Sequence, residues 1–211
     1  MGVYPMLLDE TCFFLAVDFD KEGWRADIGA VRETCRQLGL PAAVERSRSG
    51  NGGHLWLFFA EAIPAVLARK LGAHLLTETM ERRPDIGLDS YDRFFPNQDT
   101  LPKGGFGNLI ALPLQKRPRE SDDSVFVDDR LLAWPDQWAF LSSTQKITCA
   151  EAERIVRAAE QRGRVVGVGF PVLDEDNEGD EEPWTTPPSR RRVESPIVGP
   201  LPERLELVFG S

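Results

Sequence analysis

The sequence predicts a mixed α/β domain in which apolar strands alternate with amphipathic helices. An apolar run over residues 12–20 ends in two aspartates, and a segment with helical spacing of apolar side chains follows over residues 24–38. Two more apolar runs are joined by a glycine-rich loop, so the order up to residue 60 is strand, helix, strand, strand. This alternation is typical of the α/β class.

The first strand is predicted over residues 12–20 because the run is apolar, rich in aromatic side chains and followed by a polar turn sequence. Gly39 stands where the C-cap of the first helix is expected. The apolar positions of that helix recur every three or four residues: Ile28, Val31, Cys35 and Leu38. One face of the helix is therefore expected to be buried.

The middle of the chain continues with two strands, over residues 42–47 and 54–60, and a long helix over residues 63–82. Residues 87–107 lack clear periodicity and are rich in Asp, Asn, Pro, Gly and aromatic side chains, which predicts an ordered functional loop. A short apolar strand is expected over residues 108–114.

Towards the C-terminus, residues 125–127 are expected to add an edge strand, and residues 131–141 to pack over the core. Thr148 and Glu151 fit the capping box of a helix that runs to about Arg162. The composition then changes. We expect one catalytic domain followed by an acidic, proline- and arginine-rich linker and a C-terminal segment that starts a following region: residues 1–172, 173–195 and 196–211.

Composition limits the class of protein. The chain has 211 residues, 41% of them hydrophobic, which is enough for a real core. We expect no membrane partner and a cytoplasmic protein, because neither a membrane span nor a signal-like start is visible. Three widely separated cysteines argue against a disulfide framework or a zinc site.

The net charge of −9 is unusual for a protein that binds nucleic acid, because phosphate binding depends on Lys and Arg. Seven acids, however, fall within residues 174–182, which leaves −2 for the remainder. The overall charge therefore excludes no nucleic-acid function.

The two aspartates at the end of the first strand are the first candidate site. Successive strand side chains point to opposite faces, so Asp18 and Asp20 share a face while Phe19 points away. Like charges this close repel unless a cation lies between them, and hard oxygen ligands suit Mg²⁺ or Mn²⁺. The plainer interpretation is that these acids end a strand and cap the next helix.

The glycine-rich loop ends in one of only two histidines, His54. Arg46, Arg48 and Ser49 precede the loop, and both arginines are expected on one strand face. Guanidinium groups, backbone N–H groups and an imidazole would then converge on a polyphosphate. The alternatives are an ordinary Asn-Gly hairpin turn and a structural histidine.

Two-metal nucleotidyl transfer requires a third acid. Asp89 is the first candidate because it ends a short apolar stretch, and Asp92 and Asp99 are the alternatives. Lys103 and Asn108, on a second flexible loop, offer a point charge and an amide. A solvated turn explains Lys103 equally well.

Several motifs in the same order resemble the archaeo-eukaryotic primase superfamily. The matching segments are Val17-Asp18-Phe19-Asp20, Ser49-Gly50-Asn51-Gly52-Gly53-His54, Leu88-Asp89 and Asn108-Leu109-Ile110-Ala111-Leu112-Pro113. More narrowly, Gly2-Val3-Tyr4-Pro5, Tyr91-Asp92-Arg93-Phe94-Phe95-Pro96-Asn97-Gln98-Asp99 and Gly104-Gly105-Phe106-Gly107-Asn108 are similar to the primase domain of TOTE-type conflict-system proteins. The resemblance covers about residues 2–170.

The resemblance implies a fold and an activity. It implies an RRM-like antiparallel sheet with helices on one side and an N-terminal α/β unit, and transfer of a nucleoside monophosphate from an NTP or dNTP to a 3′-hydroxyl on a DNA template and primer. It also implies a helicase in cis or in trans, and a bacterial, archaeal or phage origin. The catalytic residues would be Asp18, Asp20 and Asp89, which would hold two Mg²⁺ or Mn²⁺ ions.

The resemblance also implies a nucleotide-binding set, made of the cationic side chains, the glycine loop and two lesser contacts: Arg46, Arg48, Ser49, Gly52, Gly53, His54, Lys103 and Asn108. Two departures stand out. Gly52 replaces a small hydroxyl residue of the family. The zinc-binding cysteines of many prokaryotic relatives are missing, which favours primer extension over initiation.

Two other functions fit the same residues. A metal-dependent nuclease would use the same acids to hydrolyse a phosphodiester. A non-catalytic nucleic-acid or nucleotide-binding module would keep the fold as a platform, with the basic triplet at residues 190–192 as a DNA contact. A solvated linker patch is the plainer interpretation of that triplet.

Overall fold

A computed structural model describes residues 1–101, 105 and 107–163 of the chain. These residues belong to the first of the two units into which the chain divides, Met1–Val172 and Leu173–Ser211. The predicted linker and C-terminal segment, residues 173–195 and 196–211, lie outside the described residues, as does the predicted contact Lys103.

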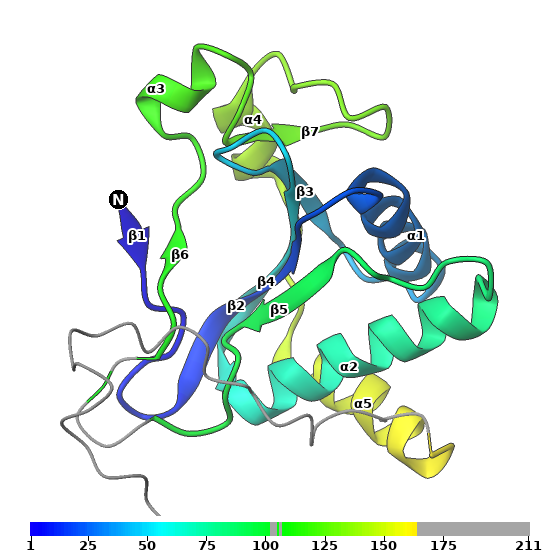
Figure 1. Ribbon diagram of the computed structural model, residues 1–211. Helices are drawn as coiled ribbons and strands as arrows, with labels where there is room; N and C mark the ends of the chain where they lie inside the picture. Colours follow the sequence, from blue (N-terminus) through cyan, green and yellow to red (C-terminus); the bar gives the residue numbers. More distant parts are fainter. Residues whose placement is uncertain (102–104, 106, 164–211) are drawn as a thin grey trace, which may run out of the picture. The chain divides into compact units, whose positions relative to one another are not determined.

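A five-stranded antiparallel sheet, in the order β5-β2-β4-β3-β7, forms the centre of this unit (Figure 1). Its strands are β2 (Thr11–Phe19), β3 (Ala43–Arg46), β4 (Gly53–Pro64), β5 (Tyr91–Phe95) and β7 (Val125–Val127). A separate two-stranded ladder is formed by β1 (Gly2–Val3) and β6 (Ile110–Ala111). The described helices are α1 (Trp24–Gln37), α2 (Ala65–Arg82), α3 (Lys116–Arg119), α4 (Gln137–Ser143) and α5 (Cys149–Gln161).

The chain order β2-α1-β3-β4-α2-β5, combined with the spatial order β5-β2-β4-β3, is the split β-α-β arrangement of an RRM-like sheet. The predicted α/β fold with an antiparallel sheet is thus confirmed. The expected N-terminal α/β unit is not separate from this sheet: β2, β3 and β4 are strands of the main sheet, α1 packs on it, and the residues before β2 contribute only β1.

The two faces of the sheet are buried by different elements. One face carries alternate residues of the central strands, such as Val17, Phe19 and Leu55, and packs against α1, α2 and α5. The other face carries a smaller cluster around Ala16, Trp56 and Phe126, against which β6 and residues of α4 pack. Because strand side chains alternate, the residues of β2 from Phe14 to Phe19 point in turn to one or the other of these two layers.

Helix α1 forms because its apolar face is buried and its C-terminus is capped. Ile28, Val31 and Cys35 are fully buried. Gly39 has a φ of 69°, and its N–H donates to the carbonyl of Arg36 at 3.1 Å, while the N–H of Leu40 donates to the carbonyl of Cys35 at 2.8 Å. These two bonds make a Schellman motif, which confirms the predicted helix end.

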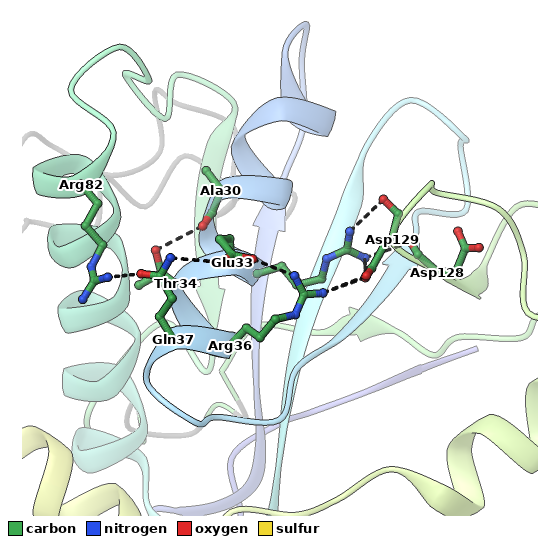
Figure 2. A network of polar contacts seen from close by, with 9 residues as sticks. Ala30, Glu33, Thr34, Arg36, Gln37, Arg82, Asp128 and Asp129 are labelled. Carbon is green, nitrogen blue, oxygen red and sulfur yellow. Dashed lines mark hydrogen bonds and ion pairs between the residues drawn. The ribbon is translucent and has the colours of Figure 1, made fainter.

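A polar network fixes the exposed side of α1 between its neighbours (Figure 2). Arg36 donates to both carboxylate oxygens of Asp129, at 2.9 and 3.0 Å, and so ties the helix to the loop after β7. Arg82 of α2 donates to Gln37. The helix is therefore held from two sides.

The structure also tests the other predicted elements. The edge strand at residues 125–127 and the capping box of α5 at Thr148 and Glu151 are confirmed. The strand expected over residues 108–114 is shorter, since β6 has two residues. The prediction of a loop over residues 87–107 is wrong for residues 91–95, which form the strand β5. The register of β5 against β2 shifts within the strand, so its sequence lacks the regular alternation that would have predicted it. No described helix combines the length and the apolarity that crossing a bilayer requires.

Candidate active site

The C-terminal end of β2 places two carboxylates on one face of the sheet. Phe19 is fully buried in the helix-covered layer and pairs with Gly53 of β4. Asp18 and Asp20 therefore project from the opposite face, as the alternation of the sequence predicts. Asp18 is 9% exposed, whereas Asp20, at the strand end, is exposed on one side and packs against Gly52 on the other.

The third carboxylate of this group comes from β5. Asp92 joins Asp18 and Asp20 with ligand oxygens that all lie within 4.8 Å of one another. Between the pairs Phe19–Tyr91 and Val17–Phe94 the edge strand has one residue more than β2, which is a β-bulge. Asp92 directly follows Tyr91, which packs in the helix-covered layer, so strand alternation turns the Asp92 side chain to the face of Asp18 and completes the acidic group.

The predicted third acid, Asp89, does not belong to this group. It lies exposed in the turn before β5, where the adjacent Ser90 is fully buried and donates to Asp27 at 2.5 Å. The other alternative, Asp99, accepts a hydrogen bond from Arg69 at 2.5 Å. Among the three acids considered from the sequence, the structure brings only Asp92 to the pair.

His54 lies beside the acids because β2 and β4 pair in register. Asp18 stands directly opposite His54, and the imidazole Nε2 lies 3.3 Å from the Oδ1 atom of Asp18. The Nδ1 atom lies 3.0 Å from Oε2 of Glu45 on β3. Burial lowers the pKa of His54, but the two flanking carboxylates outweigh it and raise the pKa to about 10.

Glu45 is a site residue that sequence reasoning missed. It is 2% exposed, stands directly opposite His54 on the neighbouring strand and also accepts a hydrogen bond from the indole of Trp56 at 2.9 Å. The only signal in the sequence was a charged residue inside a short apolar strand. Register, which a single sequence does not show, brings it to the histidine.

The glycine loop packs directly against the acids. A Cβ atom on Gly52 would lie 2.4 Å from Oδ1 of Asp20 and 2.6 Å from the carbonyl oxygen of Phe19. A Cβ atom on Gly53 would lie 2.7 Å from the ring of Trp24. Both glycines of the predicted nucleotide-binding set are thus needed for close approach of their neighbours.

The polar residues of the predicted nucleotide-binding set occupy different places. Arg46 donates to the backbone carbonyls of Asp122 and Leu131, at 3.0 and 2.6 Å, so its guanidinium holds the loops around β7. Arg48 lies exposed in the turn after β3 and does not share a strand face with Arg46, contrary to the prediction. The turn also exposes Ser49, whose hydroxyl lies 3.1 Å from that of Ser47.

The last predicted contact, Asn108, is half-buried and lies two residues before β6. Lys103, in the same loop, lies outside the described residues, so the loop is described only in part.

The electrostatics of the acidic group suit a cation. Burial and the nearby charges of Asp18 and Asp92 raise the pKa of Asp20, because three carboxylates close together resist ionisation. Oδ1 of Asp18 is buried and has no well-aligned hydrogen bond from the described residues, although His54 approaches it. An orphaned buried oxygen beside two other carboxylates fits a hard divalent metal ion.

Comparison with known proteins agrees with this geometry. The model of the family described as TOTE conflict system, Archaeo-Eukaryotic Primase domain, matches residues 1–155. A search among curated proteins found no match to the chain. The matched region contains the five strands of the sheet, the three aspartates of the acidic group and the glycine loop that ends in His54, which we call the histidine loop. The chain therefore belongs to the archaeo-eukaryotic primase family of the TOTE conflict-system type.

Proposed function

We propose that this domain is a template-dependent primase-polymerase, which transfers a nucleoside monophosphate from an NTP or dNTP to a 3′-hydroxyl and releases pyrophosphate. The observation that carries the proposal is the meeting of Asp18, Asp20 and Asp92 within 4.8 Å, beside His54. Membership of a primase family supports the reaction class, which is nucleotidyl transfer.

The three aspartates would hold divalent cations, Mg²⁺ or Mn²⁺, with Asp18 as the central ligand because it is the most buried. Bound cations supply activation of the 3′-hydroxyl and neutralisation of the triphosphate charge. Asp20 lies at the exposed end of the strand, where a nucleotide has access to it.

The histidine loop would bind the triphosphate of the incoming nucleotide. The ring nitrogen Nε2 of His54 faces the acidic group, and the exposed turn at Arg48 and Ser49 offers a cation, a hydroxyl and backbone N–H groups. Arg46 is occupied elsewhere, since its guanidinium holds the loops around β7 through the carbonyls of Asp122 and Leu131. His54 and the turn at Arg48 and Ser49 would thus bind the phosphates next to the metal ligands.

Exposed cations beside this loop would bind the DNA template and primer. The turn after α3 contacts the histidine loop, since the N–H of Ser124 donates to the carbonyl of Ser47 at 3.3 Å. Within the described part of the chain, three exposed cationic side chains of α3 make no hydrogen bond or ion pair: Lys116, Arg117 and Arg119. Free cations of this kind suit a phosphate backbone. A helicase, in cis or in trans, would supply the unwound template.

Primer extension tests the proposal. The full chain is incubated with a labelled primer on a template, dNTPs and Mn²⁺ or Mg²⁺, and compared with Asp18→Asn/Asp20→Asn. Asp85→Asn is the matched control, because Asp85 is an exposed acid that pairs with Arg83, at 2.8 Å, away from the acidic group. We expect template-dependent extension by the wild type and the control, and none by the double variant.

Other outcomes identify the competing functions. Shortening of the labelled strand without nucleotides would identify a nuclease that uses the same acids. Metal-independent DNA binding without incorporation would identify a non-catalytic module. Full extension by the double variant would reject the proposed site.

A further inference from the structure

Glu45 is a buried carboxylate that the proposed chemistry does not yet use. It is 2% exposed and lies in the middle of the sheet, on β3 between β4 and β7. A buried carboxylate is costly unless hydrogen bonds satisfy it. Glu45 is satisfied by three side chains that come from the neighbouring strand β4 and from the residue just before β7: His54, Trp56 and Ser124.

The contacts of Glu45 are divided between its two oxygens. Oε2 accepts hydrogen bonds from Nδ1 of His54 at 3.0 Å and from Nε1 of Trp56 at 2.9 Å. Oε1 lies 3.5 Å from the hydroxyl of Ser124. The oxygen that contacts the histidine is therefore itself fixed by a second, rigid ring donor.

This arrangement determines which ring nitrogen of His54 faces the acids. With Nδ1–H donated to Glu45, the imidazole is held with Nε2 3.3 Å from Asp18, on the side of the acidic group. The hydrogen bond at one ring nitrogen sets the role of the other. Outer partners of this kind commonly orient the residues that bind a ligand directly.

We propose that Glu45 is a positioning residue that locks the His54 ring so that Nε2 is presented to the phosphate groups of the bound nucleotide. The identity of that anion rests on the proposed function, whereas the locking of the ring rests on the contacts of Glu45 alone. Glu45 itself is covered by its neighbours and does not touch the nucleotide.

Two substitutions separate the hydrogen bond from the filling of space. Glu45→Gln keeps an oxygen that accepts from Nδ1–H of His54, whereas Glu45→Leu fills a similar volume without an acceptor. Ser124→Ala is the matched control, because it removes a partner of the same carboxylate that does not contact the histidine. Melting of each variant, followed by circular dichroism, reports its folded fraction.

The first measurement is the imidazole signal of His54 in the full chain labelled with ¹⁵N-histidine. Only His54 and His74 contribute signals, and His54→Gln identifies which disappear. We expect an Nδ1–H proton protected from solvent exchange in the wild type, in Glu45→Gln and in Ser124→Ala, and its loss in Glu45→Leu. Persistence of this signal in folded Glu45→Leu would overturn the proposal.

The second measurement is the affinity for a nonhydrolysable dNTP with Mn²⁺, by calorimetry. We expect the dissociation constant to rise about 10–100-fold in Glu45→Leu, and to change less than about threefold in the other two variants. Wild-type affinity in folded Glu45→Leu would overturn the proposal. So would a loss of affinity in Glu45→Gln with an intact Nδ1–H signal, because charge would then be the property that matters.

The two measurements also separate the failure of this proposal from that of the proposed function. If the wild type binds no nucleotide, the proposed function fails together with the identity of the anion, while the imidazole signal still decides whether Glu45 locks the ring. If Glu45→Leu does not fold, Glu45→Leu/Trp56→Phe removes the stranded indole donor as well. The same two outcomes then apply to that variant.

Discussion

Asp18 and His54 stand directly opposite each other on the two central antiparallel strands, with the carboxylate and the imidazole 3.3 Å apart. A cross-strand pair of this kind is fixed by backbone register and needs no mobile loop to form. The proposed metal ligand and the proposed phosphate-binding group are therefore set against each other by the sheet itself.

The first prediction concerns the third acid. Asp92→Asn should lower primer extension by more than about a hundredfold. Loss of a residue that only supports a metal ligand costs up to about a hundredfold in activity, and Asp92 is proposed to bind the metal directly. Asp89→Asn, the matched control, should extend primers at close to the wild-type rate, since Asp89 is exposed outside the acidic group. The reverse ranking in a single-turnover assay would assign the site to Asp89.

The second prediction concerns the contact of Gly52 with Asp20. Gly52→Ala places a methyl group 2.4 Å from Oδ1 of Asp20, so we expect a loss of about 1–3 kcal/mol in the free energy of unfolding from overpacking. Extension should fall about a hundredfold, since a ligand displaced by about 1 Å disturbs the reacting geometry.

Gly29→Ala is the control for that substitution. Gly29 lies within α1, and a Cβ atom there meets nothing within 4 Å. This variant should gain about 0.5–1 kcal/mol, because alanine is the better helix former. Urea denaturation measures both changes, and an unchanged Gly52→Ala activity would show that the displaced carboxylate is not a ligand.

The third prediction concerns the cations of α3. Arg117→Glu/Arg119→Glu should weaken binding to a primer-template and lower the slope of log affinity against log salt by about one for each phosphate that the protein no longer neutralises. Arg154→Glu/Arg157→Glu on α5 makes the same change in net charge on the helix-covered side of the sheet. An equal decrease in affinity for both variants, measured by fluorescence anisotropy, would indicate a general charge effect.

The fourth prediction concerns pH, in protein kept free of metal with EDTA. The pKa of His54 is raised to about 10 in the folded chain, from an ordinary value of 6.5. Its interactions with the flanking carboxylates therefore stabilise the fold fully below about pH 6.5, and this contribution is lost as the pH rises to about 10.

The measurement is the difference in unfolding free energy between the wild type and His54→Gln, at pH 6, 8 and 10. This difference should shrink by about 2 kcal/mol or more over the range. Buried thiols such as Cys12, whose pKa is raised to about 12, contribute equally to both proteins and cancel. A difference that stays constant with pH would contradict the ion pairing of His54.

Local patterns predicted the elements that depend on local rules. Three elements can be recognised from a short stretch of sequence: the apolar strand that ends near Asp20, the helix α1 with its regular apolar spacing, and the helix capped by Thr148. The same holds for the shared face of Asp18 and Asp20, since alternation follows from strand geometry alone.

The remaining features depend on pairing between distant segments. Three contacts join residues of different strands or loops: the approach of Asp92 to Asp18 through the pairing of β5 with β2, the bond between Glu45 and His54, and the bonds of Arg46 to the loops at Asp122 and Leu131. Register and irregular pairing are not encoded in the periodicity of one chain segment. For this reason the histidine could be proposed from the sequence, whereas its supporting residue could not.

The edge position of β5 makes the acidic group separable into two parts. Asp18 belongs to a central strand that pairs on both sides, whereas Asp92 belongs to a strand that pairs on one side only. Substitutions that loosen this edge strand would withdraw the third carboxylate while β2, β4 and β3 stay paired. Evolution can therefore silence such a domain by weakening its rim and still retain it as a folded scaffold.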